Sequence, residues 1–179
     1  MNQSSIRLIE CNEADHASEI LDIFNEAIAN STALYDYQPR TADSIHNWFA
    51  TKKQHNFPVI GAIDETGQLL GFASWGAFRA FPAYKYTIEH SIYIQHEQRG
   101  RGLGKLLLQA LIERAKQSDQ IHVMIGCIDA SNVASIRLHE KLGFHHAGTF
   151  KQVGFKFGDW LDAAFYQLIL NTPSHPIDG

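Results

Sequence analysis

An alternating apolar pattern is joined to a helical one by the stretch Arg99-Gly100-Arg101-Gly102-Leu103-Gly104-Lys105, which holds three glycines and three cations. Apolar residues at positions 103, 106, 107, 110 and 111 predict the helix, because they recur about every 3.6 residues. The first amides of a helix have no acceptor within the helix and lie at the positive end of its dipole. Glycines at alternate positions remove the Cβ atoms that would keep a polyanion away from these amides. The spacing therefore predicts a pyrophosphate-binding site at a helix N-terminus.

Two other phosphate-binding motifs can be compared with this stretch. A Walker loop needs Gly at position 99 and Ser or Thr at position 106, where the chain has Arg99 and Leu106. A dinucleotide-binding fingerprint needs a third glycine at position 105, which is Lys105. Neither motif is present. A glycine-rich turn that only caps a helix remains the alternative interpretation.

Strands and helices alternate on both sides of this stretch. Apolar periodicity and turn residues predict strands at 6–9, 58–63, 69–75, 86–95, 121–128, 144–153 and 159–170, and helices at 15–30, from 41, from 103 and at 132–142. The strand, helix and strand from 86 to 128 predict a parallel pair joined by a right-handed crossover. We expect one α/β domain over residues 1–179 with a mixed sheet, and a frayed polar tail at 171–179.

The composition indicates a soluble globular protein. Hydrophobic residues make up 45% and charged residues 19% of the chain, which excludes a disordered protein. A net charge of -4 without a basic block argues against nucleic-acid binding. No apolar run of membrane-spanning length and no signal peptide are present, so we expect a cytoplasmic protein without membrane association. Cys11 and Cys127 form no CxxC pair and the ten histidines show no ligand spacing, so no disulfide and no metal are expected.

The spacing of Arg99, Gly102 and Gly104 resembles the Gln/Arg-x-x-Gly-x-Gly/Ala signature of the GNAT superfamily of N-acetyltransferases. Three further stretches resemble one branch of it, the phosphinothricin and methionine sulfoximine or methionine sulfone acetyltransferases: 86–94, 132–144 and 153–162. The resemblance covers residues 6–170. It implies the GNAT fold of about seven strands with flanking helices, a central parallel pair splayed for acetyl-CoA, and a homodimer.

The resemblance also implies which residues bind acetyl-CoA, the co-substrate of the family. The amides of the glycine loop would hold its pyrophosphate, and the main chain of residues 92–94 would bind the pantetheine arm. Asn132 would cap the helix that it begins, reach the pantetheine, or do both. The expected cofactor-binding residues are Ile92, Tyr93, Ile94, Arg99, Gly100, Arg101, Gly102, Leu103, Gly104, Lys105 and Asn132.

Two residues are expected to carry the chemistry of acetyl transfer. Because an α-amino group titrates near 8, its proton must be removed near neutral pH. By resemblance, Glu89 is the general base, and partial burial on a central strand raises the pKa of such a carboxyl. His139 lies where the branch has a histidine that protonates or hydrogen-bonds the leaving thiolate. The alternatives are a solvent-facing strand glutamate and a surface or satisfied core histidine.

Substrate selection is expected from the loops opposite the thioester. The planar guanidinium of Arg79 can donate two parallel hydrogen bonds to a carboxylate or to an oxidised sulfur or phosphorus group. Phosphinothricin-preferring members have a second cation at position 81, where this chain has Phe81, so it matches the methionine-derivative members better. Lys156 is interpreted as a solvated lysine, with contact to substrate or a partner subunit as the alternative. The expected substrate-binding residues are Tyr35, Trp75, Phe78, Arg79, Tyr84, Thr87 and Glu89.

The predicted reaction is direct acetyl transfer to the α-amino group of a small L-amino acid in a ternary complex. Cys127 is placed in a buried strand and is a poor nucleophile. Two alternatives stay open: an acetyltransferase for another amine, such as a protein N-terminus or a polyamine, and a non-catalytic acyl-CoA-binding sensor. Arg79 argues against a cationic polyamine, and the presence of Glu89 and His139 argues against the sensor.

Overall fold

The structure is a computed structural model and describes residues 6–178. Hydrogen bonds join its strands into a mixed sheet in the order β1-β2-β3-β4-β5-β7-β6. The elements along the chain are β1 (Arg7–Glu10), α1 (Glu13–Asn30), α2 (Ala42–Gln54), β2 (Val59–Ile63), β3 (Leu69–Ala77), β4 (Thr87–Ile94), α3 (Leu103–Lys116), β5 (Val123–Asp129), α4 (Val133–Lys141), β6 (His145–Lys156) and β7 (Asp159–Ile169). The expected mixed α/β fold is confirmed, and the observed boundaries differ from the predicted ones by at most three residues.

The described residues divide into two compact units, 6–74 with 92–111 and 75–91 with 112–178. The strands β3 and β4 and the helix α3 each pass from one unit into the other.

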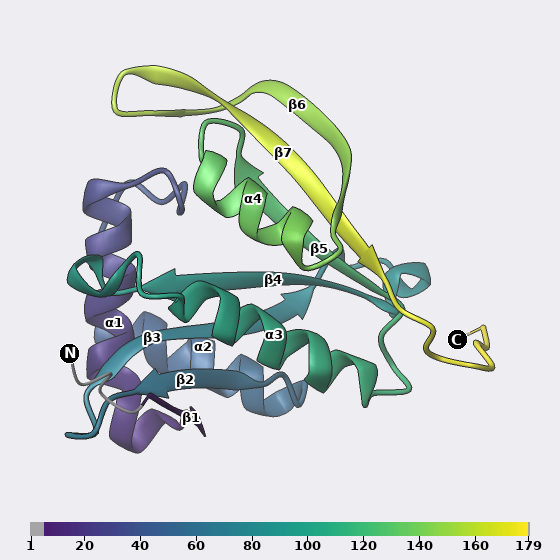
Figure 1. The fold of residues 1–179 in the computed structure, drawn as a ribbon, viewed down its shortest axis with the longest axis horizontal. Coiled ribbons are helices and arrows are strands. Elements are labelled where there is room, and N and C mark those ends of the chain that lie inside the picture. The colour runs from purple at the N-terminus through teal and green to yellow at the C-terminus, as the bar shows by residue number, and fades with distance from the viewer. Residues whose placement is uncertain (1–5, 179) are drawn as a thin grey trace. The chain divides into compact units, whose positions relative to one another are not determined.

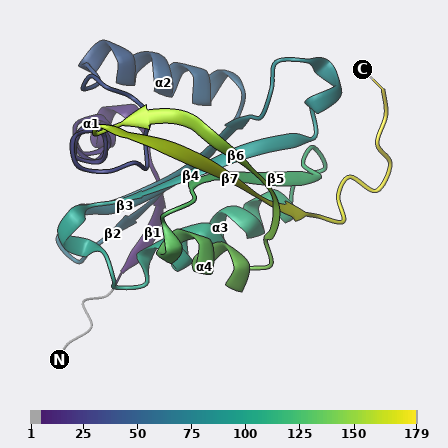
Figure 2. The same cartoon turned by 90° about the horizontal axis from the view of Figure 1, so that it is seen from above.

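In the first unit, two helices bury one face of the antiparallel strands β1, β2 and β3. Asn12 begins α1 by accepting a hydrogen bond from the Asp15 amide, and Thr41 begins α2 in a capping box with Ser44. Figures 1 and 2 show α1 and α2 on one face of β2 and β3, with the start of α3 on the other face. Large buried side chains join the helices to the strands: Ile20, Phe24, Ile45, Phe49, Leu69 and Phe72.

In the second unit, the beginning of β4 pairs with β5 in parallel, as the strand–helix–strand pattern predicted. The strand β5 also pairs with β7, and β7 pairs with β6; both pairings are antiparallel. The helix α4 begins at Asn132, whose Oδ1 accepts a hydrogen bond from the Ser135 amide at 3.0 Å. Figure 1 shows α4 lying along β5.

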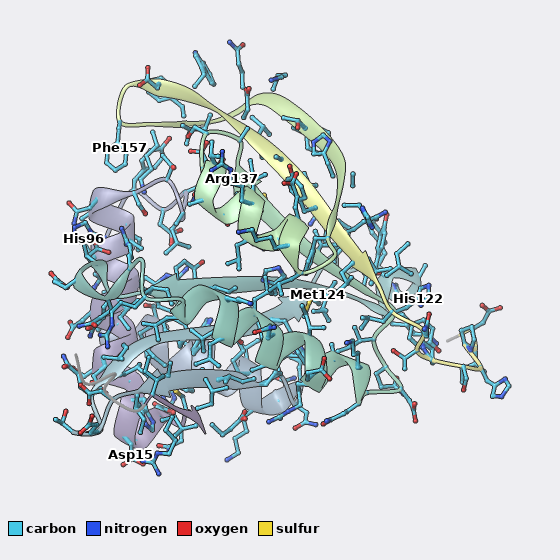
Figure 3. The ribbon with its side chains drawn as sticks, in the orientation of Figure 1. Asp15, His96, His122, Met124, Arg137 and Phe157 are labelled. Atoms are coloured by element: carbon cyan, nitrogen blue, oxygen red, sulfur yellow. The ribbon has the colours of Figure 1, made fainter. Side chains whose placement is uncertain are left out.

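The tail after β7 is anchored instead of frayed. The Nδ1 of His122 lies 2.8 Å from the Thr172 carbonyl oxygen, and Figure 3 shows His122 where the chain leaves β7. The Tyr86 hydroxyl accepts a hydrogen bond from the Ile177 amide at 3.1 Å. The sequence could not predict these contacts, because they join positions 50 and 91 residues apart. Gly179 lies outside the described residues. None of the described helices combines the length and apolarity that a membrane span requires.

Candidate active site

Backbone amides gather at the glycine loop and the start of α3. Gly100 and Gly102 have φ angles of +78° and +83°, which side chains of L-residues disfavour. Among the described residues, no atom lies within 4 Å of a Cβ placed at either glycine. The first helical bond joins the Leu106 amide to the Gly102 carbonyl, so the amides of residues 103–105 have no acceptor within the helix. Free amides beside open space fit a pyrophosphate.

The cations of this loop lie in different surroundings. The Nη2 of Arg99 donates a hydrogen bond to Oε2 of Glu26 at 2.9 Å, and its Nε lies 3.4 Å from the Ile94 carbonyl. Arg99 therefore ties the loop to α1 and β4. Arg101 contacts Gln98, and the Lys105 side chain is exposed in the first turn of α3.

Of residues 92–94, Tyr93 packs its side chain against the core of the first unit. The Tyr93 ring packs edge-on against Phe24 at 5.0 Å. A Cβ at Gly71 would lie 2.7 Å from the Tyr93 carbonyl oxygen, so glycine lets β3 approach this segment. The prediction for residues 92–94 is that their main chain binds the pantetheine arm. The packing of the Tyr93 side chain is compatible with it, and it stays a prediction.

In the second unit, Arg79 and Glu89 form a pair of opposite charges. The Nη1 of Arg79 lies 3.8 Å from Oε2 of Glu89, and 36% of the Glu89 side chain is exposed. Burial raises the pKa of Glu89 above its usual 4.5, and the Arg79 cation offsets part of this rise. Glu89 pairs with Ile125 in the last step of the parallel register that the structure describes between β4 and β5. The carboxylate has the partial burial and the raised pKa that a general base requires.

Aromatic residues surround Arg79. Its guanidinium lies 4.1 Å from the centre of the Phe78 ring, and its Nη1 donates a hydrogen bond to the Phe78 carbonyl. The rings of Phe78 and Tyr84 meet edge-on at 5.7 Å, and the Phe78 amide donates to the Thr87 carbonyl. The structure thus brings together Phe78, Arg79, Tyr84, Thr87 and Glu89, and their role in binding substrate stays a prediction.

Trp75, Phe81 and Tyr35 complete the residues that the sequence connects with substrate selection. Trp75 is buried at the end of β3, and Phe81 is exposed in the loop that carries Arg79. Tyr35 lies in the first unit, on the segment after α1, so its place in a substrate pocket stays a prediction.

His139 is paired with His90, a histidine that is not among the predicted site residues. The Nε2 atoms of His139 and His90 lie 3.2 Å apart, and their rings stack at a centroid distance of 5.0 Å. Only 4% of His139 and 7% of His90 are exposed. The Phe144 ring meets both imidazoles edge-on. Burial lowers the pKa of His139, and burial together with His139 lowers the pKa of His90 to about 3.

The predicted catalytic residues lie on opposite faces of the paired strands β4 and β5. Adjacent residues of a strand point to opposite faces, so Glu89 and His90 point apart, as do Gly126 and Cys127. His90 and Gly126 face α4 and His139. Glu89 and Cys127 share the other face, where the Glu89 carboxylate acts on the thiol. A signal for His90 was present in the sequence, since it alternates with the buried Ile88.

Two expectations about single side chains are wrong. Cys127 lies in a strand as predicted, but its side chain reaches the surface instead of the core. Partial desolvation and the Glu89 carboxylate still raise its pKa to about 11, so the thiol is protonated at neutral pH and remains a poor nucleophile. Lys156 is only 4% exposed and is not a solvated lysine. Lys156 is the last residue of β6, and the alternation of the strand places its side chain inward and that of Phe155 outward.

Comparison with known proteins gives one family. The sequence matches the model of the "Acetyltransferase (GNAT) family" over residues 19–144. An L-methionine sulfoximine/L-methionine sulfone acetyltransferase of Pseudomonas aeruginosa is 46% identical over 158 residues, which cover 88% of this chain and 91% of that protein. A phosphinothricin N-acetyltransferase of Streptomyces coelicolor is 32% identical over 150 residues, which cover 83% and 87%.

Solved structures agree with this match. An acetyltransferase from Acinetobacter baylyi ADP1 is 65% identical with a TM-score of 0.98, over 100% of this chain and 99% of that one. An acetyltransferase from Salmonella typhimurium, solved with its cofactor acetyl-CoA, is 36% identical with a TM-score of 0.91, over 97% and 99%. With the glycine loop, the fold and these matches in agreement, the chain belongs to the acetyltransferase (GNAT) family.

Proposed function

We propose that the protein is an acetyl-CoA-dependent N-acetyltransferase for the α-amino group of small L-amino acids of the methionine sulfone, methionine sulfoximine or phosphinothricin type. The observation that carries this proposal is the 3.8 Å approach of Arg79 to Glu89. An α-amino acid has its ammonium group and its carboxylate on one carbon. A cation beside a base can receive both groups at once. The names of the relatives from Pseudomonas and Streptomyces support this substrate class.

The proposed mechanism is direct transfer in a ternary complex. Acetyl-CoA supplies the acetyl thioester. The amides of the glycine loop hold its pyrophosphate, and the main chain of residues 92–94 and Asn132 hold the pantetheine arm. Glu89 accepts a proton from the ammonium group, directly or through a water, and Arg79 orients the carboxylate. The protonated Cys127 thiol gives no support to an acyl-enzyme.

Phe81 bears on the choice among these substrates. It is exposed, apolar and two residues from Arg79. A single guanidinium in this loop suffices for a carboxylate, whereas the additional charge of a phosphinate favours a second cation. We therefore propose that methionine sulfone and methionine sulfoximine are better substrates than phosphinothricin.

The experiment is a thiol-release assay with acetyl-CoA and four amines: methionine sulfone, methionine sulfoximine, phosphinothricin and spermidine. Arg79→Ala is expected to lower kcat/KM for methionine sulfone by about 10- to 100-fold, the worth of a charge-assisted contact of about 1.5–3 kcal/mol. The variant should also raise the pKa of Glu89, because the Arg79 cation lowers that pKa in the wild type. The acid limb of kcat/KM should therefore move to higher pH.

Arg114→Ala is the matched control, because Arg114 is exposed on α3; wild-type rates are expected. Turnover of spermidine without turnover of the amino acids would refute the proposed substrate class. It would leave the proposed acetyl-CoA site unaffected. Acetyl-CoA binding without turnover of any amine would favour the sensor.

We also propose that two copies of the chain associate through the hairpin of β6 and β7. Large apolar side chains of this hairpin are exposed, and such side chains mark protein–protein contact sites where they gather. Figure 3 shows Phe157 at the turn of this hairpin. The exposed large apolar residues of the hairpin are Phe150, Val153, Phe155, Phe157, Trp160 and Ile169.

Light scattering after size exclusion tests this association. The wild type is expected to have the mass of a dimer, and Trp160→Glu that of a monomer, because the variant buries a charge at the contact. Tyr37→Glu, an equally drastic change at an exposed aromatic residue of the first unit, should leave the mass unchanged. A monomeric wild type would refute the proposal.

A further inference from the structure

The proton positions of the His90–His139 pair follow from its contacts. The Nδ1 of His139 lies 2.7 Å from the Ser135 carbonyl oxygen, which can only accept, so Nδ1 carries a proton. A neutral imidazole carries one proton, so the Nε2 of His139 is an acceptor. The Nε2 of His90, at 3.2 Å, must then be the donor. This leaves the buried Nδ1 of His90 without a proton, and that atom has no hydrogen-bond partner among the described residues.

The surroundings of the pair keep both rings uncharged. The groups that face it are the Phe144 ring, Gly126 and the Ser135 carbonyl. The charged and titratable residues of the same elements point elsewhere: Glu89, Cys127 and Asp129 to the opposite face of the strands, and Arg137, Glu140 and Lys141 to the exposed side of α4. Figure 3 shows Arg137 on α4. An added proton would therefore stay in an apolar site without a counter-ion.

Gly126 is the residue that lets the two rings meet. A Cβ at this position would lie 3.0 Å from Nε2 of His90 and 3.1 Å from Nε2 of His139. Both distances are tighter than ordinary contacts of a Cβ, so any side chain here would displace the two nitrogens. The pair thus depends on three elements at once: β4, β5 and α4.

We propose that His90 is a positioning residue for His139: its Nε2–H holds His139 as the neutral Nδ1–H tautomer and keeps the Nε2 of His139 a proton acceptor. This inference rests on the proposed acetyl transfer and on the expectation from the family resemblance that His139 lies near the leaving thiolate. In this state His139 has no proton to give to the leaving sulfur. The substrate ammonium loses two protons when it becomes an amide nitrogen: Glu89 accepts one, and the other balances the leaving thiolate.

The first test is nitrogen-15 NMR of the histidine side chains near pH 7. The wild type should show an Nδ1–H histidine whose signal is removed by His139→Gln, and an Nε2–H histidine whose signal is removed by His90→Gln. His139 as an imidazolium or as the Nε2–H tautomer in the wild type would overturn the proposal. This measurement needs no substrate, so it decides the pair even if the proposed reaction fails.

The second test compares His90→Phe with His90→Gln in pH profiles of kcat/KM. The amide nitrogen of Gln reaches the place of the imidazole Nε2 and can donate to His139, whereas Phe cannot. His90→Phe should raise the pKa of His139 and so add a second acid limb, that of His139, to the limb set by Glu89. His90→Gln should restore the wild-type profile. Equal profiles for the wild type and both variants would overturn the proposal.

Gly126→Ala separates the pair without removing either imidazole. It should shift the resonances of both histidines and add the same second acid limb as His90→Phe. If His90→Phe fails to fold, this variant and the wild-type spectrum still decide the proposal. Unchanged histidine resonances in Gly126→Ala would contradict the close contact on which the inference rests.

Discussion

Glu89→Gln is expected to lower kcat for methionine sulfone by about 10²- to 10⁴-fold, the usual worth of a general base. Gln keeps the size of the side chain and its place on β4 but cannot accept the proton of the ammonium group. Steady-state kinetics with saturating acetyl-CoA measure the loss.

The pH profile is a second test of Glu89 as the general base. A base works only when it is deprotonated, so activity should rise with pH through the pKa of Glu89, above the usual 4.5. Glu89→Gln should remove this limb from its residual activity. Glu113→Gln is the control: Glu113 is exposed on α3, pairs with Lys116, and should leave kcat unchanged. More than a tenth of the wild-type kcat in Glu89→Gln would exclude the base role.

Gly102→Ala is expected to weaken acetyl-CoA binding by about 10- to 100-fold, as for the loss of a charge-assisted hydrogen bond. The φ angle of +83° disfavours Ala, so the loop should relax and turn its amides away from the pyrophosphate. The new methyl group would also enter the open space beside the loop. Calorimetric titration with acetyl-CoA measures the dissociation constant.

Gly67→Ala is a matched control for backbone strain. Gly67 has a φ angle of +88° in the turn between β2 and β3, and no described atom lies within 4 Å of a Cβ placed there. Both variants should lose a similar stability of about 1–2 kcal/mol, seen as similar falls in Tm. Only Gly102→Ala should lose affinity. An equal loss of acetyl-CoA affinity in both variants would show that the glycine loop is only a structural turn.

The local elements were largely predictable from the sequence. Asn12, Thr41 and Asn132 each accept a hydrogen bond from the amide three residues further on, so helix starts follow from a few neighbouring positions. The parallel pair of β4 and β5 was predictable because a helix must connect its strands. The amide cluster at Gly102 belongs to the same class, since a turn and a helix start create it locally.

Side-chain partners across the sheet were decided by the tertiary structure. His90 and His139 are 49 residues apart, and their contact requires the missing Cβ of Gly126 on a third element. The exposure of Cys127 and the burial of Lys156 depend on which face of each strand is covered, and periodicity within one strand does not identify the covering element. The sequence by itself determined the loop chemistry and the order of elements, because these follow from short-range backbone geometry. Only the packing of distant segments decided the pairing of His90 with His139, because it depends on distances that register and close approach set.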